Sequence, residues 1–292
     1  MMEFGVSTLI DFDVPFETRL DMFRTAGMTR IALSEERHLP ISQPDIFKFV
    51  NRALIRRQMT VEHVHGPISP RLDFTSGDHD IVDATLAVHR QIVRATADLG
   101  CSMLVVHVSS YPDLEYDNLE EATKQAIGCL MDLIEYARPF GVDIVIENQP
   151  FRYKSQRVID HIIEEFPKNE LRVCLDTCHI MMGNPDPLAF VRTWADFIVT
   201  THFSDSNGLS DDHLIPGAGN FPWIEGLSIL RKANRLKFIT FENSSWGEEP
   251  FEPYLERTVL AGKWLCQLWT RAGIEKTQPD MVRQFRPERR RA

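Results

Sequence analysis

Several side chains that could bind a metal ion stand at the ends of short apolar runs of the sequence. Each run ends in, or is followed by, a histidine, an aspartate or a glutamate, with no lysine among them. Imidazole nitrogen and carboxylate oxygen together suit Zn²⁺, Mn²⁺, Co²⁺ or Fe²⁺, whereas an all-oxygen set would better suit Mg²⁺ or Ca²⁺. The pattern therefore predicts a site for a divalent cation. The residues are His65, His107, Glu147, Asp176, His179, His202 and Glu242.

Two cysteines flank the aspartate of this set in the stretch RVCLDTCHI, residues 172–180. Cys174 and Cys178 have the spacing C-x3-C without a second pair, which does not indicate a structural zinc knuckle, and no C-x-x-C redox pair is present. We interpret both thiols as packing groups. The chain has 5 cysteines, and its start lacks the basic and apolar stretches of a signal peptide. We therefore expect reduced thiols and a cytoplasmic location.

The apolar runs alternate with segments of helical periodicity. Several runs are apolar without alternation, which is typical of parallel strands covered on both faces. The predicted strands are 4–10, 30–34, 60–66, 102–109, 142–148, 171–177, 197–205 and 237–243, and the predicted helices are 16–26, 44–58, 80–99, 119–138, 156–166, 187–196, 223–234 and 252–272. Glycine at positions 27, 100 and 141 stands between a helix and the next strand, as expected of a helix C-terminus.

Strand–helix units that repeat in this way predict an α/β protein with a single (β/α)8 TIM barrel. The alternative, a doubly wound open sheet, usually has a glycine-rich turn after its first strand, and TLIDFDVPF has none. In a barrel the C-terminal ends of all strands meet on one face, so the candidate ligands would converge at one mouth. We assign residues 1–275 to the barrel and residues 276–292 to a polar, arginine-rich C-terminal extension.

Charge and hydropathy restrict the partners. The formal net charge is -10, which does not favour nonspecific binding to nucleic acid or to an anionic membrane. No uncharged apolar run approaches the ~18 residues that a membrane-spanning helix needs. We therefore expect a small-molecule partner and no membrane, and the sequence leaves a homo-oligomer open.

Several motifs resemble those of the xylose isomerase-like barrel superfamily. They are VIEN at 145–148, CLDTCH at 174–179, HFSDSNG at 202–208, DDHLIPGAGN at 211–220 and FEN at 241–243. That superfamily holds sugar and sugar-phosphate isomerases and epimerases, related dehydratases, and the type-IV apurinic-site endonucleases. The resemblance implies one divalent ion, Mn²⁺, Co²⁺ or Zn²⁺, held by Glu147, Asp176, His202 and Glu242. It also implies that Glu147 and Glu242 act as acid–base groups and that His179 contacts the substrate.

The endonuclease branch of the superfamily is the alternative. It uses nine ligands for three zinc ions, and counterparts for all of them can be placed here, which adds His65, His107, His179, Asp211 and His213 as further metal ligands. The chain departs from that branch where Ile68 replaces a tyrosine, where NQPFRY replaces a glycine-rich continuation, and where ENS replaces Glu-Thr-Pro. A nucleic-acid substrate is therefore not favoured. A lyase or dehydratase on the same scaffold stays open, because proton abstraction next to a carbonyl begins both reactions.

The main hypothesis is a metal-dependent isomerase or epimerase that acts on a sugar or polyol-like carbonyl compound through an enediolate. A base removes the proton next to the carbonyl, a cation stabilises the enediolate, and an acid returns a proton. Besides His179, the candidate substrate-binding residues are His65, His107, His213 and Arg152, the last as a clamp for an anionic group.

Other polar residues are interpreted as structural. His63 shares the face of His65 and is expected inside the barrel or behind the metal ligands. The run PGAGN at 216–220 fits a plain turn as well as a phosphate-binding loop. The side chains of His38, His79, His89 and His161 are expected at the surface, and so is that of Glu35, with the mouth of the barrel as its alternative place.

Overall fold

The computed structural model describes residues 2–11, 13–35, 39–69, 71–109, 119–150, 154–166, 170–245 and 249–270. Arg152 and the C-terminal extension 276–292 lie outside the described residues, so their predicted roles stay predictions. The ends of all the predicted strands, where the candidate ligands stand, are described.

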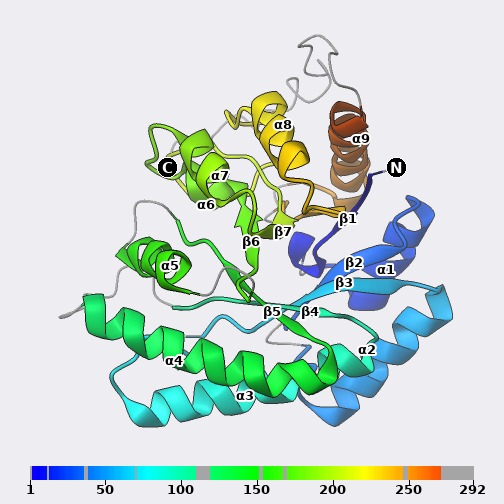
Figure 1. Cartoon of the computed structure of the whole chain (residues 1–292). Coiled ribbons are helices and arrows are strands. Elements are labelled where there is room, and N and C mark those ends of the chain that lie inside the picture. The colour runs from blue at the N-terminus through cyan, green and yellow to red at the C-terminus, as the bar shows by residue number, and fades with distance from the viewer. Residues whose placement is uncertain are drawn as a thin grey trace, which may run out of the picture.

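Eight parallel strands form the centre of the described part of the molecule (Figure 1). They are β1 (Glu3–Val6), β2 (Arg30–Ser34), β3 (Thr60–His65), β4 (Met103–Val106), β5 (Asp143–Glu147), β6 (Val173–Asp176), β7 (Ile198–His202) and β8 (Phe238–Phe241). Strands β2 to β7 pair in sequence order, and β1 pairs with β8. Single parallel bridges from Ser7 to Ala32 and from Phe203 to Phe241 join the two sheets into a barrel. The predicted TIM barrel is confirmed.

Helices surround the strands on the outside (Figure 1). Those that the sequence predicts are α1 (Phe16–Thr25), α2 (Pro44–Arg57), α3 (His79–Asp98), α4 (Leu119–Ala137), α5 (Lys154–Glu165), α7 (Pro187–Trp194), α8 (Trp223–Ala233) and α9 (Phe251–Thr270). Gly27, Gly100 and Gly141 have φ angles of 86°, 70° and 67°. This left-handed conformation costs glycine little, so the helical segments end where the sequence predicts.

Three short helical segments differ from the prediction: η1 (Thr8–Ile10), η2 (Arg138–Phe140) and α6 (Thr177–Met181). The first strand ends at Val6 because the hydroxyl of Ser7 accepts a hydrogen bond from Leu9 N–H and starts η1. Helix α6 starts directly after β6, because the carboxylate of Asp176 caps it. Segments this short show no periodicity in the sequence.

The apolar core lies mainly between the strands and the helices that cover them. Phe23, Leu104 and Phe241 are fully buried there. A separate and much smaller apolar cluster lies on the other face of the strands, inside the barrel, and consists of Val105, Val145 and Cys174. The barrel interior also holds buried polar side chains, which must find partners there. They include Glu62, His63, Thr200, His202 and Thr240.

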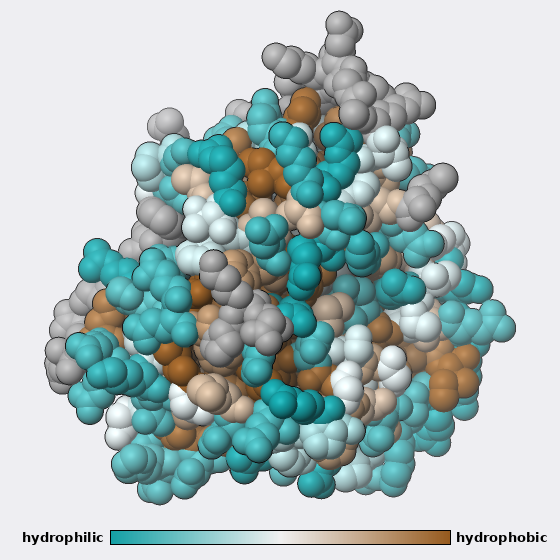
Figure 2. Space-filling view, viewed as in Figure 1, coloured by the Kyte–Doolittle hydropathy of each residue, from teal (hydrophilic) through white to brown (hydrophobic). Residues whose placement is uncertain are grey.

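The face of the molecule in Figure 2 is mainly hydrophilic. Hydrophobic side chains, in brown, appear there in small groups between hydrophilic ones. None of the described helices is both long and apolar enough to cross a bilayer.

Candidate metal centre

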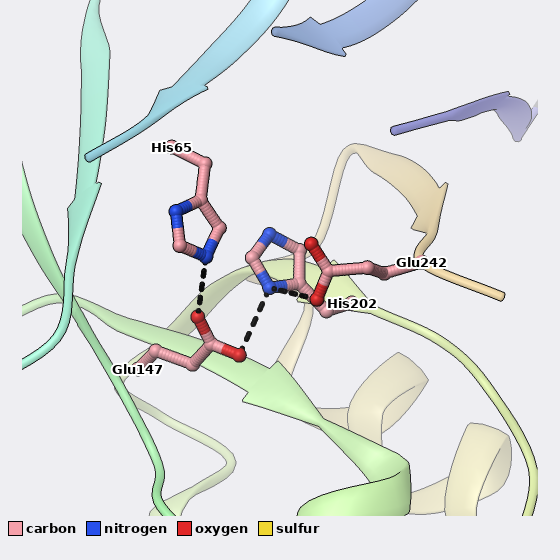
Figure 3. A group of neighbouring side chains, drawn as sticks. All are labelled: His65, Glu147, His202 and Glu242. Atoms are coloured by element: carbon pink, nitrogen blue, oxygen red, sulfur yellow. Dashed lines mark ion pairs between the residues drawn. The ribbon is translucent and has the colours of Figure 1, made fainter. Parts of the chain in front are cut away.

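Four candidate ligands point toward one another where the strands end (Figure 3). Glu147 ends β5, His202 ends β7, His65 ends β3 and Glu242 follows β8. One ligand atom from each of these residues lies within 4.8 Å of the others. We call these four residues the inner group. The barrel thus brings together residues that lie far apart in the sequence.

Glu147 has the most contacts with histidines in this region. Its Oε2 is 3.2 Å from His65 Nε2 and 2.9 Å from His107 Nε2. Its Oε1 is 3.0 Å from His202 Nδ1, which in turn is 3.2 Å from Oε2 of Glu242. The side chain of Glu147 is fully buried. A carboxylate placed in this way can contact cations on more than one side.

The four ligands that the resemblance implies each have a buried atom without a hydrogen-bond partner. Among the described residues these atoms include Glu147 Oε1, Asp176 Oδ2, His202 Nδ1 and Glu242 Oε1. Leaving a buried polar atom unpaired costs about 1–3 kcal/mol, and here such atoms stand on four residues at the ends of strands. His202 Nδ1 lies close to two carboxylates but not in hydrogen-bonding geometry. These carboxylates and this imidazole are donor types that a divalent cation binds.

Asp176 ends β6 and uses its two carboxylate oxygens differently. Oδ1 accepts a hydrogen bond of 2.8 Å from the backbone N–H of His179 and caps α6, while Oδ2 has no partner. Asn148 holds this strand end. Its amide donates to the Asp176 carbonyl at 3.0 Å, and its Oδ1 accepts from the Asp176 N–H at 2.8 Å. Asn148 is a positioning residue that the sequence analysis missed, although a polar residue directly after a buried strand was a signal for it.

A second group of candidate ligands lies around Asp211. Ligand atoms of Asp176, His179 and His213 lie within 4.8 Å of one another. His179 Nε2 is 3.7 Å from Asp211 Oδ2, and His213 Nε2 is 3.2 Å from Asp211 Oδ1. Asp176, which the resemblance implies as a ligand of the single ion, thus groups with His179 and His213, whereas His65 is the fourth member of the inner group. The Asp211 side chain is 45% exposed, so solvent or substrate can reach it.

The loop between β7 and α8 carries Asp211 and His213, and the buried side chain of Asp205 anchors it. The Asp205 carboxylate accepts four hydrogen bonds of 2.8 to 3.0 Å, from the backbone N–H groups of Ser206, Gly217 and Phe221 and from the indole N–H of Trp223. The N–H of Gly217 therefore binds Asp205, and the PGAGN run forms a turn around this carboxylate rather than a phosphate-binding loop. Sequence patterns do not reveal Asp205, because its partners lie in an irregular loop and at the first residue of α8.

Opposite pKa shifts distinguish the two glutamates of the inner group. Burial raises the pKa of Glu242 to about 8, and the charge of Glu147 adds to this shift. Burial also opposes the charge of Glu147, but His202 and His107 hold its pKa well below the usual range. Neighbouring carboxyl groups with divergent pKa values are typical of acid–base pairs.

Two residues expected at the surface are not there. His89 is buried in α3, its Nδ1 donates to the Thr85 carbonyl at 2.7 Å, and burial lowers its pKa to about 4. Glu35 is half-buried, and its carboxylate accepts hydrogen bonds of 2.7 Å from the N–H of Ile41 and from the hydroxyl of Ser42. Both polar groups stabilise local structure, which explains their burial.

Other interpretations agree with the structure. His63 lies inside the barrel, and His79 and His161 are exposed. Cys174 and Cys178 are fully buried, and burial raises the pKa of both thiols, as expected of packing groups. His38, like Arg152, lies outside the described residues.

One family model, several relatives and many solved structures are similar to this chain. The model of the xylose isomerase-like TIM barrel matches residues 20–257. An uncharacterized protein of Methanocaldococcus jannaschii is 24% identical over 251 residues, which cover 84% of each chain. A crystal structure of a D-psicose 3-epimerase in the presence of D-fructose has 15% identity and a TM-score of 0.77, over 92% of this chain and 99% of that one. A crystal structure of the IolI protein with a zinc atom has 15% identity and a TM-score of 0.75, over 92% and 98%. This chain belongs to the xylose isomerase-like TIM barrel family.

Proposed function

We propose that this protein is a divalent-metal-dependent isomerase or epimerase that acts on a sugar or polyol-like carbonyl compound. The observation that carries the proposal is the set of buried, unpartnered atoms of Glu147, Asp176, His202 and Glu242 at the ends of the strands. The shared fold of a D-psicose 3-epimerase and of a zinc-containing IolI protein supports it. The proposed partner is therefore a small sugar-like molecule.

The four unpartnered atoms are the proposed ligands of one Zn²⁺, Mn²⁺ or Co²⁺ ion. Carboxylates and an imidazole form the mixed oxygen and nitrogen set that these ions accept. Buried carboxylates without a counter-charge are costly, and the carboxylates of this set need a cation for that reason. When bound, the cation would supply the positive charge that stabilises negative charge on the substrate oxygens.

Glu147 and Glu242 are the proposed acid–base groups. They lie on either side of His202 Nδ1, at 3.0 and 3.2 Å (Figure 3). One carboxylate removes the proton next to the carbonyl of a substrate held between them. The other returns a proton, to the opposite face of the same carbon in an epimerase or to the neighbouring carbon in an isomerase.

Imidazoles near Asp211 are the proposed substrate-binding groups. His179 Nδ1 donates to the Asn148 carbonyl at 2.8 Å, and His213 Nδ1 donates to the Glu242 carbonyl at 2.6 Å. Burial opposes a charge on either ring, but the neighbouring carboxylates, Asp211 among them, raise the pKa of both. Each Nε2 can therefore carry a proton and donate to a hydroxyl oxygen. Further candidates are His65, His107 and, outside the described residues, Arg152.

Two measurements test this function. Elemental analysis of protein supplied with Zn²⁺, Mn²⁺ or Co²⁺ is expected to find one tightly bound ion per chain. Incubation of the loaded protein in deuterium oxide with D-fructose, D-psicose and D-tagatose is expected to place deuterium next to the carbonyl of at least one sugar. Glu147→Gln and Glu242→Gln are expected to abolish this exchange, and the exposed control His161→Gln to keep it. Full exchange in both glutamine variants would overturn the assigned roles.

A second candidate is a trinuclear-zinc phosphodiesterase that cleaves DNA at abasic sites. The group around Asp211 and the approach of His65 and His107 to Glu147 favour it, since they offer ligands for two further cations. Three zinc ions per chain and incision of an abasic duplex would support it. One ion per chain, with metal content unchanged in Asp211→Asn, would exclude it. A lyase or dehydratase would be recognised by a cleaved or dehydrated sugar product.

A further inference from the structure

Two buried ionisable side chains, Glu62 and His63, lie behind His202 and take no part in the proposed chemistry. Both belong to β3. The pairing of β3 with β2 is irregular between Ile31 and Ala32, so that Glu62 is an extra residue in its strand. A β-bulge of this kind redirects side chains. It explains how two consecutive residues can both reach the interior of the barrel.

A series of hydrogen bonds joins the Glu62 carboxylate to His202. Oε2 of Glu62 contacts Nδ1 of His63, and the hydroxyl of Thr200 donates to the same oxygen at 3.0 Å. Nε2 of His63 lies 2.9 Å from Nε2 of His202. The other ring nitrogen of His202, Nδ1, faces the two glutamates of the inner group. The series therefore ends on the side of His202 opposite the cation ligands.

The donor and acceptor roles in this series follow from the carboxylate. Oε2 of Glu62 accepts from the hydroxyl of Thr200 and can accept in the same way from Nδ1 of His63; with the hydrogen on Nδ1, Nε2 of His63 is an acceptor. The hydrogen between the two rings then belongs to Nε2 of His202. This leaves a lone pair on His202 Nδ1, which agrees with the absence of a hydrogen bond from that atom to the nearby carboxylates. A neutral imidazole binds a metal ion through such a lone pair.

We infer that Glu62 and His63 are positioning residues that fix the tautomer and the ring orientation of His202 for cation binding. The inference rests on the cation site of the proposed function. Histidines that bind metal ions commonly donate their other ring N–H to a carboxylate or a carbonyl. In this barrel a second histidine stands between the carboxylate and the ligand.

Two variants and a control test this inference. Glu62→Leu/His63→Leu removes both polar partners at once, which avoids leaving one buried polar group of the pair alone. Glu62→Gln keeps an oxygen that can accept from His63. The control His89→Leu removes another buried histidine, whose Nδ1 bonds the Thr85 carbonyl. Zn²⁺ affinity is measured by competition with a chromophoric chelator, the His202 tautomer in metal-free protein by ¹H–¹⁵N NMR of the ring nitrogens, and folding by thermal unfolding.

The expected results distinguish a failure of the positioning role of Glu62 and His63 from a failure of the cation site itself. Metal-free wild-type protein should hold His202 with the proton on Nε2. The double variant should lose about 10- to 100-fold in Zn²⁺ affinity and show mixed tautomers, while Glu62→Gln loses less and the control keeps both properties. A wild-type His202 protonated on Nδ1, or unchanged affinity in a folded double variant, would overturn the inference alone. A wild-type protein that binds none of Zn²⁺, Mn²⁺ and Co²⁺ would overturn the proposed function with it.

Discussion

Removal of the Asp205 carboxylate is expected to loosen the loop that carries Asp211 and His213 without changing the inner group. In Asp205→Ala four donors lose their acceptor: the backbone N–H groups of Ser206, Gly217 and Phe221 and the indole N–H of Trp223. The two backbone hydrogen bonds between residue 205 and Leu214, of 2.8 and 2.9 Å, do not involve the side chain and remain. The substitution therefore tests the carboxylate itself.

The magnitude follows from the number of donors. A buried donor that loses its partner costs about 1–3 kcal/mol. The four donors belong to buried residues, and the lower figure is taken as the minimum for each. Four donors then give about 4 kcal/mol. The burial that raises the pKa of Asp205 opposes its charge in the wild-type protein, and removal of the charge offsets part of the loss. At about 2 °C per kcal/mol for a chain of this size, the four donors alone would lower the melting temperature by about 8 °C, and the offset makes the net fall smaller.

Thermal unfolding of metal-free Asp205→Ala checks this estimate. Asp196→Ala, at an exposed position, is the control and should change stability by less than about 0.5 kcal/mol. Amide hydrogen exchange should become faster over residues 206–221 but not in the strands. Zn²⁺ affinity should stay the same, because the inner group lies outside the loop. A melting temperature within about 2 °C of the wild type, with unchanged exchange in the loop, would refute the reasoning.

Three further predictions follow from the same structure. Affinity for Zn²⁺ should rise between pH 6 and 9, because the proton on Glu242, with a pKa of about 8, must leave before the ion binds. Calorimetry in two buffers should detect the release of this proton, and a constant affinity over this range would contradict the role of Glu242 as a ligand. Asn148→Ala removes two hydrogen bonds to the backbone of Asp176, so it should lower the melting temperature by about 4 °C and weaken metal binding. An unchanged metal affinity would show that Asn148 does not position Asp176. Gly219→Ala should destabilise the protein by more than about 1 kcal/mol, since its Cβ would lie 2.3 Å from Asp205 Oδ1, and a neutral effect in thermal unfolding would disprove this close approach.

The barrel could be predicted from the sequence because its signals are local. Apolar runs, helical periodicity and the glycines between helix and strand each depend on neighbouring residues, and every predicted strand is present in the described chain. His89 shows where such reasoning fails. It lies four residues after Thr85 and four before Val93, and both are buried in α3. The periodicity therefore placed His89 on the buried face, but its polar ring suggested the surface.

The ligand set was harder to predict than the barrel, because burial and hydrogen bonding, rather than residue type, separate a ligand from a structural group. Asp176 has both roles: Oδ1 caps α6, and Oδ2 is buried without a partner. The sequence marks both His179 and His213 as candidate ligands or substrate-binding residues. In the structure both have the same arrangement: Nδ1 is bonded to a backbone carbonyl and Nε2 faces Asp211. Those carbonyls belong to Asn148 and Glu242, so only the folded barrel reveals them.

A cation held beside the 45% exposed Asp211 would keep water as a ligand and exchange more readily than one enclosed by the inner group. Ions counted at equilibrium with free Zn²⁺, before dialysis, therefore separate a one-metal site from a three-metal site.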